Sequence, residues 1–183
     1  NQRAQIFLPA GGQVLADVLV SAIGDVTWAK SMHWAENTFR WVRPLHGILA
    51  VFDGKPLDFA LDLGDAKISA VETTTGHRFM APDAITVTGF DDYRDKLKTA
   101  YVILDSAERR TLMREGAEAL AKDAGLSLRA DERLISEIAG LVEWPVPLMG
   151  TIDDAFMDLP PEVLATSMAK HQRYLALETG DGD

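Results

Sequence analysis

The residues best suited to chemistry in this chain lie between positions 73 and 79, in the string TTTGHRF. Three threonine hydroxyls precede Gly76, and the imidazole of His77 and the guanidinium of Arg78 follow it. Such a set could hold a phosphate or a carboxylate, and a base beside hydroxyls could orient a water for hydrolysis. The same residues are equally typical of a structural turn, in which Gly76 allows a close backbone approach and Arg78 forms an ion pair.

A second candidate is the string MHWAENTFRWVRPLH at positions 32–46, where aromatic side chains alternate with Arg40 and Arg43. In a strand, Phe39 and Trp41 would share one face while Arg40 points away from it. Rings and cations together can stack bases and neutralise phosphates. The alternative is a core strand with a solvated arginine beside it.

A third group of cations, Lys170 and Arg173, lies near the end of a helix that Pro160 and Pro161 are predicted to open. We expect the apolar face of this helix to continue as far as Leu175. Cations at a helix C-terminus complement its dipole, so RNA contact is not needed to explain them.

Several kinds of catalytic site find no match in the sequence. It has no G-x-x-x-x-G-K-[ST] loop, no G-x-G-x-x-G and no G-x-S-x-G, and none of its four histidines has a second ligand-type residue at the H-E-x-x-H spacing. It also has no cysteine. We therefore predict no catalytic residue, no bound cofactor and no metal site in these 183 residues.

The charge of the chain limits its possible partners. The net charge is −10, and most of it lies after residue 100. An acidic surface binds RNA poorly, so any RNA contact must be local or shared with other domains, although ordinary solubility also explains the charge. The apolar run 14–26 contains Asp17 and Asp25, so it predicts a helix and not a membrane span.

The pattern of apolar residues and turn residues predicts an α+β fold, with several helices packed on a mixed or antiparallel sheet. Asp53-Gly54 is the clearest signal, because it predicts a type I′ hairpin between strands 45–52 and 56–63, the second with one wet face. Further strands are predicted at 68–75, 84–88, 101–104 and 146–149, the last two buried.

Four helices after the first are predicted from their capping residues. Asp91 or Asp92 begins a helix that ends near Ala100. Ser106 begins a long helix that Gly125 stops, and Asp131 begins a shorter one. Asp153 is expected to cap a short turn of helix before Pro160.

We expect a single α+β domain at residues 1–177, followed by a flexible acidic tail at 178–183. Its parts are a helix-rich start at 1–30, a sheet-rich core at 31–105 and a helical and strand part at 106–177. Because the chain starts with Asn1 and ends in an acidic run, we expect it to be a piece of a longer polypeptide.

Long ordered strings in the chain resemble the beta subunit of the bacterial heterotetrameric glycyl-tRNA synthetase. They are SMHWAENTFRWVRPLH, VETTTGHRFMAP, AYVILDSAERR, GLVEWPVPLMG and LPPEVLATSMAKHQRYLAL. The chain departs from the family pattern at His33, where arginine is usual, and at Gly47, where an aromatic residue often follows the histidine.

The resemblance implies an early-middle piece of a beta chain in a cytoplasmic tetramer of two alpha and two beta chains. In that enzyme the alpha subunit uses ATP and Mg to activate glycine, and the beta subunit serves tRNA recognition and assembly. More distantly, the chain is similar to the editing module of the phenylalanyl-tRNA synthetase beta chain.

These observations favour a non-catalytic module that positions tRNA or the alpha subunit, without contact to a membrane. The alternatives are hydrolytic editing of mischarged tRNA by His77 and the threonines, and contact with protein alone. Glycine is the smallest amino acid, so its pocket can exclude larger ones sterically, which weighs against editing. The candidate RNA contacts are Arg40, Arg43, His77, Arg78, Lys170 and Arg173.

Overall fold

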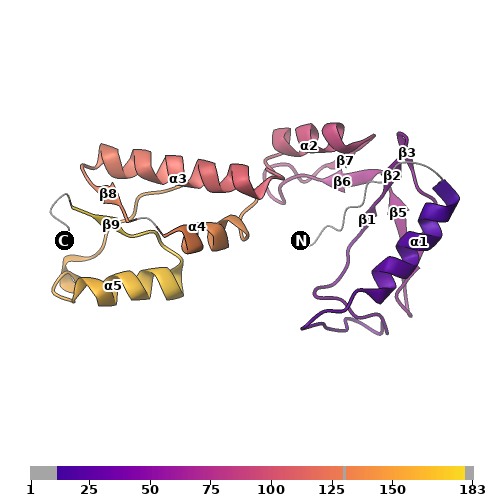
Figure 1. The fold of residues 1–183 in the computed structure, drawn as a ribbon, viewed down its shortest axis with the longest axis horizontal. Coiled ribbons are helices and arrows are strands. Elements are labelled where there is room, and N and C mark those ends of the chain that lie inside the picture. Colours follow the sequence, from indigo (N-terminus) through magenta and orange to yellow (C-terminus); the bar gives the residue numbers. More distant parts are fainter. Residues whose placement is uncertain (1–11, 130, 180–183) are drawn as a thin grey trace. The chain divides into compact units, whose positions relative to one another are not determined.

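The structure is a computed structural model that describes residues 12–129 and 131–179. The chain divides into two compact units, one ending at Ala100 and the other beginning at Tyr101. The described residues form five α-helices and four sheets of two or three strands, so the predicted α+β class is confirmed (Figure 1).

The first unit begins with α1 (Gly12–Asp25), which buries one face against the core. Leu15, Leu19 and Ile23 recur every fourth residue and are buried, as a helical stripe requires. Not every apolar residue of the predicted helix 14–26 is buried, however, because Val14 and Val18 are exposed. Since the helix packs on one side only, it buries a narrower face than its apolar residues could cover.

A mixed three-stranded sheet completes this core. The strand β5 (Lys67–Val71) lies between β1 (Ile48–Leu49), which is parallel to it, and β4 (Ala60–Asp62), which is antiparallel. In the segment leading to and through β4, Leu57, Leu61 and Leu63 are buried and the intervening aspartates are exposed. The predicted wet face is therefore confirmed.

The predicted hairpin is also present, although its strands are short. It joins β2 (Val51–Phe52) to β3 (Lys55–Pro56) in antiparallel register. Asp53 and Gly54 have φ angles of 49° and 74°, so both adopt the left-handed conformation of a type I′ turn.

The first unit ends with β6 (Thr73–Thr75), which pairs with β7 (Ala84–Thr86), and with α2 (Phe90–Thr99). The predicted cap of α2 was wrong, because Gly89 occupies the N-cap position and makes no side-chain cap bond. Asp92 lies in the first turn instead, where it accepts hydrogen bonds from Thr88 N and from Lys96 Nζ, both at 2.9 Å.

The second unit is built on α3 (Ser106–Asp123) and α4 (Glu132–Ala139). The cap of α3 is Asp105, one residue before the predicted Ser106, and the carboxylate of Asp105 accepts from Ala107 N. Asp131 caps α4 as predicted, by accepting from Leu134 N at 2.9 Å.

Residues 101–104 do not form the predicted strand. Val102 and Ile103 are buried, as a central strand would be, but the segment has no strand partner. Its groups find other partners: Arg109 Nη1 donates to the carbonyl oxygens of Ile103 and Leu104 at 2.6 and 2.9 Å, and Ile103 N donates to Glu143 O at 2.9 Å. Arg109 Nε donates to the carbonyl oxygen of Ala139, at the end of α4, at 2.8 Å.

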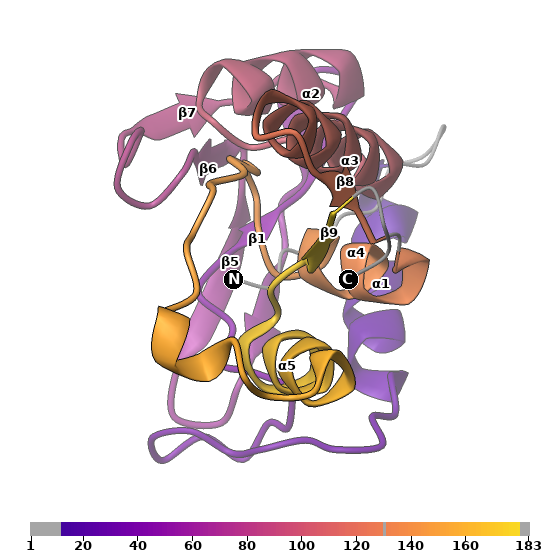
Figure 2. The ribbon, with the colours of Figure 1, turned by 90° about the vertical axis from the view of Figure 1, so that its left-hand side faces the viewer.

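The predicted buried strand at 146–149 is wrong as well, because Val146 and Leu148 are exposed. The remaining elements are η1 (Asp154–Phe156), α5 (Pro161–Ser167), η2 (Met168–Gln172), and β9 (Leu177–Glu178), which pairs with β8 (Ser127–Leu128). In both views α5 lies beneath β9 (Figure 2).

The C-terminal helix is shorter than the pattern predicted. Arg173 has a φ of 61° and ends it, so Leu175 lies beyond the helix. Glu178, the first residue of the predicted tail, belongs to β9, and residues 180–183 lie outside the described part of the chain.

Candidate nucleic-acid interface

The turn that follows β6 is held firmly by its backbone. His77 N donates to Ala100 O at 2.8 Å, and Ala81 N donates to His77 O at 2.9 Å. Gly76 is buried, and a Cβ atom there would lie 2.5 Å from the Cβ of Ala100. The predicted close backbone approach at Gly76 is therefore confirmed, and it ties the turn to the end of α2.

The side chain of His77 closes this turn from within. Its Nδ1 atom accepts hydrogen bonds from the backbone N–H groups of Phe79 and Met80, each at 3.3 Å. Because Nδ1 is an acceptor, the neutral ring carries its proton on Nε2. With Nδ1 occupied, Nε2 is a hydrogen-bond donor and not a proton acceptor, so this geometry suits the binding of a ligand better than the activation of a water.

The tip of the turn presents a cation beside an aromatic ring. Arg78 is exposed, and its Cζ atom lies 5.3 Å from the ring centroid of Phe79, which is itself 80% exposed. Among the described residues Arg78 has no carboxylate partner, so the ion pair considered above is not formed. Sequence reasoning missed Phe79, although an aromatic residue directly after a cation in a turn could have indicated it.

The three threonines before the turn do not form one set with His77. They lie in β6, where successive side chains point to opposite faces. Thr74 is half-buried, while Thr73 and Thr75 are exposed on the other face. The strand geometry therefore separates hydroxyl groups that the sequence placed together.

Arg40 and Arg43 lie on a different segment of the first unit. Residues 39–42 form no strand, and only an isolated bridge joins Met32 to Trp41. Arg40 donates from Nε to Ser31 Oγ at 3.1 Å and from Nη2 to Ser31 O at 3.3 Å. Arg43 Nη1 donates to Val42 O at 2.8 Å.

The aromatic residues around these arginines pack on one another. The ring of Phe39 stacks on that of Trp41 with centroids 5.8 Å apart, and the ring of Trp34 meets Phe39 edge-on. Trp41 is buried in the core, and Trp34 and Phe39 pack against it. The rings in this segment therefore serve the core, which is the alternative considered above.

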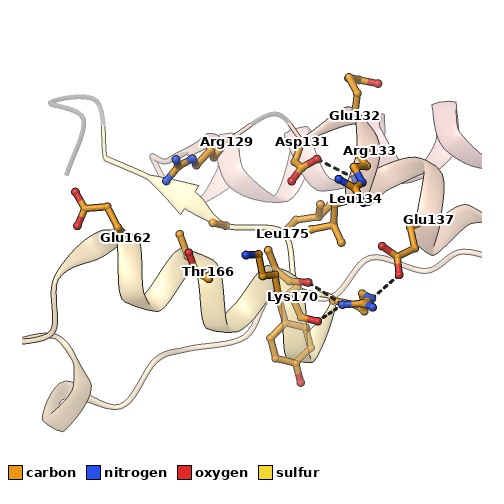
Figure 3. Close-up of a pocket in the computed structure, with 15 residues that line it drawn as sticks. Arg129, Asp131, Glu132, Arg133, Leu134, Glu137, Glu162, Thr166, Lys170 and Leu175 are labelled. Carbon is orange, nitrogen blue, oxygen red and sulfur yellow. Dashed lines mark hydrogen bonds and ion pairs between the residues drawn. The ribbon is translucent and has the colours of Figure 1, made fainter.

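The other two predicted cations lie in the second unit, where they line an open groove of about 930 Å³ between α4, α5 and η2 (Figure 3). Four cations and four carboxylates line it, which leaves it without net charge. They are Arg129, Arg133, Lys170, Arg173, Asp131, Glu132, Glu137 and Glu162.

Most of these charges are already paired or bonded. Arg173 Nε lies 2.8 Å from Glu137 Oε1, and its guanidinium also donates to the carbonyl groups of Ala169 and Lys170 at the end of η2. Arg129 pairs with Glu178. Within residues 12–129 and 131–179, Lys170 Nζ has no bonding partner, and neither does the guanidinium of Arg133, a cation that sequence reasoning missed.

Two charged residues of α2, Asp92 and Arg94, have shifted pKa values. The hydrogen bond from Lys96, helped by those from Thr88, lowers the pKa of the Asp92 carboxyl. The hydrogen bond to Asp95 raises the pKa of Arg94. Both arginine and aspartate therefore stay charged near neutral pH.

The described residues hold no group of three or more carboxylate, histidine or cysteine side chains arranged to bind a metal ion. None of the described helices combines the length and the apolar character needed to span a bilayer.

Comparison with known proteins gives a consistent result. A family model described as glycyl-tRNA synthetase beta subunit matches residues 10–183. Glycine–tRNA ligase beta subunits from Rhodospirillum centenum and Paracoccus denitrificans are 48% and 51% identical over 98% and 90% of this chain. The one from Rickettsia felis is 39% identical over 93% of it. The matched regions are 28%, 24% and 26% of these relatives, so the chain spans about a quarter of their length.

Proposed function

The chain belongs to the family of glycyl-tRNA synthetase beta subunits, and we propose that it is a non-catalytic module of a glycine–tRNA ligase. In this proposal the module helps to position the tRNA and to assemble the beta chain with the alpha subunit. The observation that carries it is the match of residues 10–183 to beta subunits of this ligase. The predicted resemblance is thereby confirmed at the level of the family.

The complete enzyme is proposed from the resemblance as a cytoplasmic tetramer of two alpha and two beta chains. Activation of glycine with ATP and Mg takes place on the alpha subunit. The residues of this chain supply contacts and shape to that assembly.

The proposed RNA contacts differ in how free they are to bind. Arg78 and Lys170 have no carboxylate partner among the described residues, so a phosphate can replace water at either without breaking a bond in the protein. Arg40, Arg43 and Arg173 already donate to protein acceptors. Binding a phosphate at these three arginines would cost existing protein hydrogen bonds, so it gains less free energy than binding at Arg78 or Lys170. Arg78 and Lys170 are therefore the first candidates for RNA contact.

Measuring tRNA binding by the assembled enzyme at several salt concentrations tests this proposal. Loss of a phosphate contact should weaken binding to all tRNA sequences alike and reduce the salt slope by about 1. We expect this weaker binding and reduced salt slope for Arg78→Ala, and smaller changes of both for Arg43→Ala. The matched control is Arg94→Ala, because Arg94 is also exposed in the first unit but is paired with Asp91 and Asp95.

An unchanged affinity and an unchanged slope for Arg78→Ala would remove the turn from the interface. If the assembled enzyme failed to bind tRNA, the proposal for the whole module would be wrong.

The alternative is a hydrolytic editing module, suggested by the distant likeness to the phenylalanyl enzyme. No contact within the described residues favours it, since His77 Nδ1 is occupied and the threonines alternate across a strand. Incubation of the chain with alanyl-tRNA charged on the glycine acceptor tests it. Deacylation well above background, abolished in His77→Ala, would favour editing.

A further inference from the structure

The connection between α4 and η1 is an irregular segment whose backbone makes no hydrogen bond to the rest of the described chain. Residues 145–152 form neither helix nor strand, and Figure 2 shows them as a plain ribbon leading to η1. Within the described chain, no backbone N–H or C=O of these residues has a hydrogen-bond partner. We call residues 145–152 the open segment.

The side chains of the open segment are apolar and face water. Val146 is 64% exposed and Leu148 86% exposed, and Met149 and Ile152 are exposed as well. The exposure continues through Phe156, Met157, Leu159 and Val163. Single exposed apolar residues are ordinary, but such a run marks an interaction surface.

The chain holds the open segment in place at its start. The ring of Trp144 meets that of Tyr101 edge-on, with centroids 5.4 Å apart. Pro147 lies so close over α3 that a Cβ atom on Gly116 would come within 2.8 Å of its Cγ. The segment is therefore an ordered edge that exposes unpaired backbone groups, which is what an added strand requires.

The sequence pattern and the structure disagree here in an informative way. An apolar run bounded by prolines and Gly150 predicted a buried strand, while the structure shows the same residues irregular and uncovered. The apolar pattern and the exposure of the segment are compatible if the partner that covers it lies outside the described residues. We propose that the open segment is a docking edge, which another segment of the beta-subunit polypeptide pairs with and covers.

The charges around the open segment narrow the choice of partner. Residues 141–163 contain five carboxylates and no lysine, arginine or histidine. RNA is excluded as a partner because no cation is present to meet its phosphates. A second copy of the chain is disfavoured because the same carboxylates would face one another. The partner that fits the open segment is an apolar protein strand with lysine or arginine near its ends.

The source of this strand follows from the length of the relatives. The chain matches 28% and 24% of the beta subunits of R. centenum and P. denitrificans, so most of those polypeptides lies outside the matched region. A segment of the same polypeptide is tethered and therefore has a high effective concentration at the edge. The inference rests on membership of the family and not on the proposed tRNA contacts.

Hydrogen exchange measured by mass spectrometry tests the inference on two proteins. One is the 183-residue chain alone. The other is the full-length beta subunit of R. centenum without its alpha subunit. We expect the amides of the open segment to exchange rapidly in the short chain and at least about ten-fold more slowly at the aligned positions of the long one. The amides of α3 serve as the control and should be slow in both.

Each other outcome overturns the inference. Rapid exchange in the full-length beta subunit would show that no part of that polypeptide covers the edge. Protection that arises only after addition of the alpha subunit would assign the edge to that partner. Protection of the short chain that grows with its concentration would assign it to a second copy.

A pair of substitutions at Leu148 provides a second readout. Leu148→Pro removes one backbone N–H, whereas Leu148→Ala shortens the side chain and keeps the N–H. In the short chain we expect both variants to melt like the wild type, because Leu148 is 86% exposed and its N–H is unpaired. In the full-length subunit the proline at the aligned position should lower the melting temperature more than alanine. Equal effects there would contradict strand pairing.

Discussion

Arg109 joins the start of the second unit to the end of α4 through its hydrogen bonds. Arg109→Ala should therefore destabilise the second unit strongly. The guanidinium of Arg109 donates to three carbonyl oxygens, those of Ile103, Leu104 and Ala139. These carbonyls belong to the segment before α3 and to the end of α4. Without the guanidinium, the carbonyl groups of Ile103 and Leu104 lose the partner that replaces strand hydrogen bonds, while the Ile103 N–H keeps its bond to Glu143 O at 2.9 Å.

The magnitude follows from the number of bonds and their burial. A hydrogen bond to a charged group contributes about 1.5–3 kcal/mol. Two of the three bonds share Nη1, and Arg109 is half-buried, so water can replace part of the loss. We therefore expect a decrease of about 3 kcal/mol in the free energy of unfolding, which is well below the sum of three full bonds.

Urea unfolding followed by circular dichroism measures this decrease. Arg110→Ala is the matched control, because Arg110 is the next residue of the same helix and makes one 3.5 Å contact with Ser106 Oγ. It should cost less than about 0.5 kcal/mol. Arg109→Lys keeps the charge but cannot reach three acceptors in a plane, so it should fall between the two. Equal stability of Arg109→Ala and Arg110→Ala would refute the reasoning.

Three further predictions concern the first unit. Gly76→Ala should lower the free energy of unfolding by about 2 kcal/mol, because its Cβ would overlap Ala100, whereas Gly89→Ala, with open space around it, should be nearly neutral in the same urea experiment. Asp92→Asn should lower the melting temperature at neutral pH but not in acid: the pKa of Asp92 is lowered in the folded state, so its contribution is present above its ordinary pKa of 3.8 and is lost as pH falls through the lowered value. Phe79→Ala should weaken tRNA binding by about ten-fold if a base stacks on the exposed ring, and Phe79→Tyr should restore it, while equal affinities of all three proteins would show that the ring is not used.

Some elements could be predicted because their cause lies within a few residues. Asp53-Gly54 specifies its turn through the left-handed conformation that both residues tolerate. Asp131 caps α4 by a bond to a residue three positions away. Pro160 and Pro161 begin α5 because a helix does not use the first N–H groups. Each of these predictions needed no knowledge of distant contacts.

The predicted strands at 101–104 and 146–149 were wrong for a shared reason. A strand exists only when a second segment pairs with it, and an apolar run does not say whether that segment is present. Arg109 takes the place of a strand partner in the first case. In the second case the backbone stays unpaired among the described residues.

The sequence by itself determined the family, the α+β class, and the cations and aromatic residues available for binding, because these depend on residue types and their order. Only the tertiary structure decided which of those cations are free. Ser31 comes within reach of Arg40, Ala100 within reach of His77, and Glu137 within reach of Arg173 through folding of segments distant in the chain. A side chain is available for a ligand when no protein partner satisfies it, and that depends on contacts across the fold which no local pattern contains.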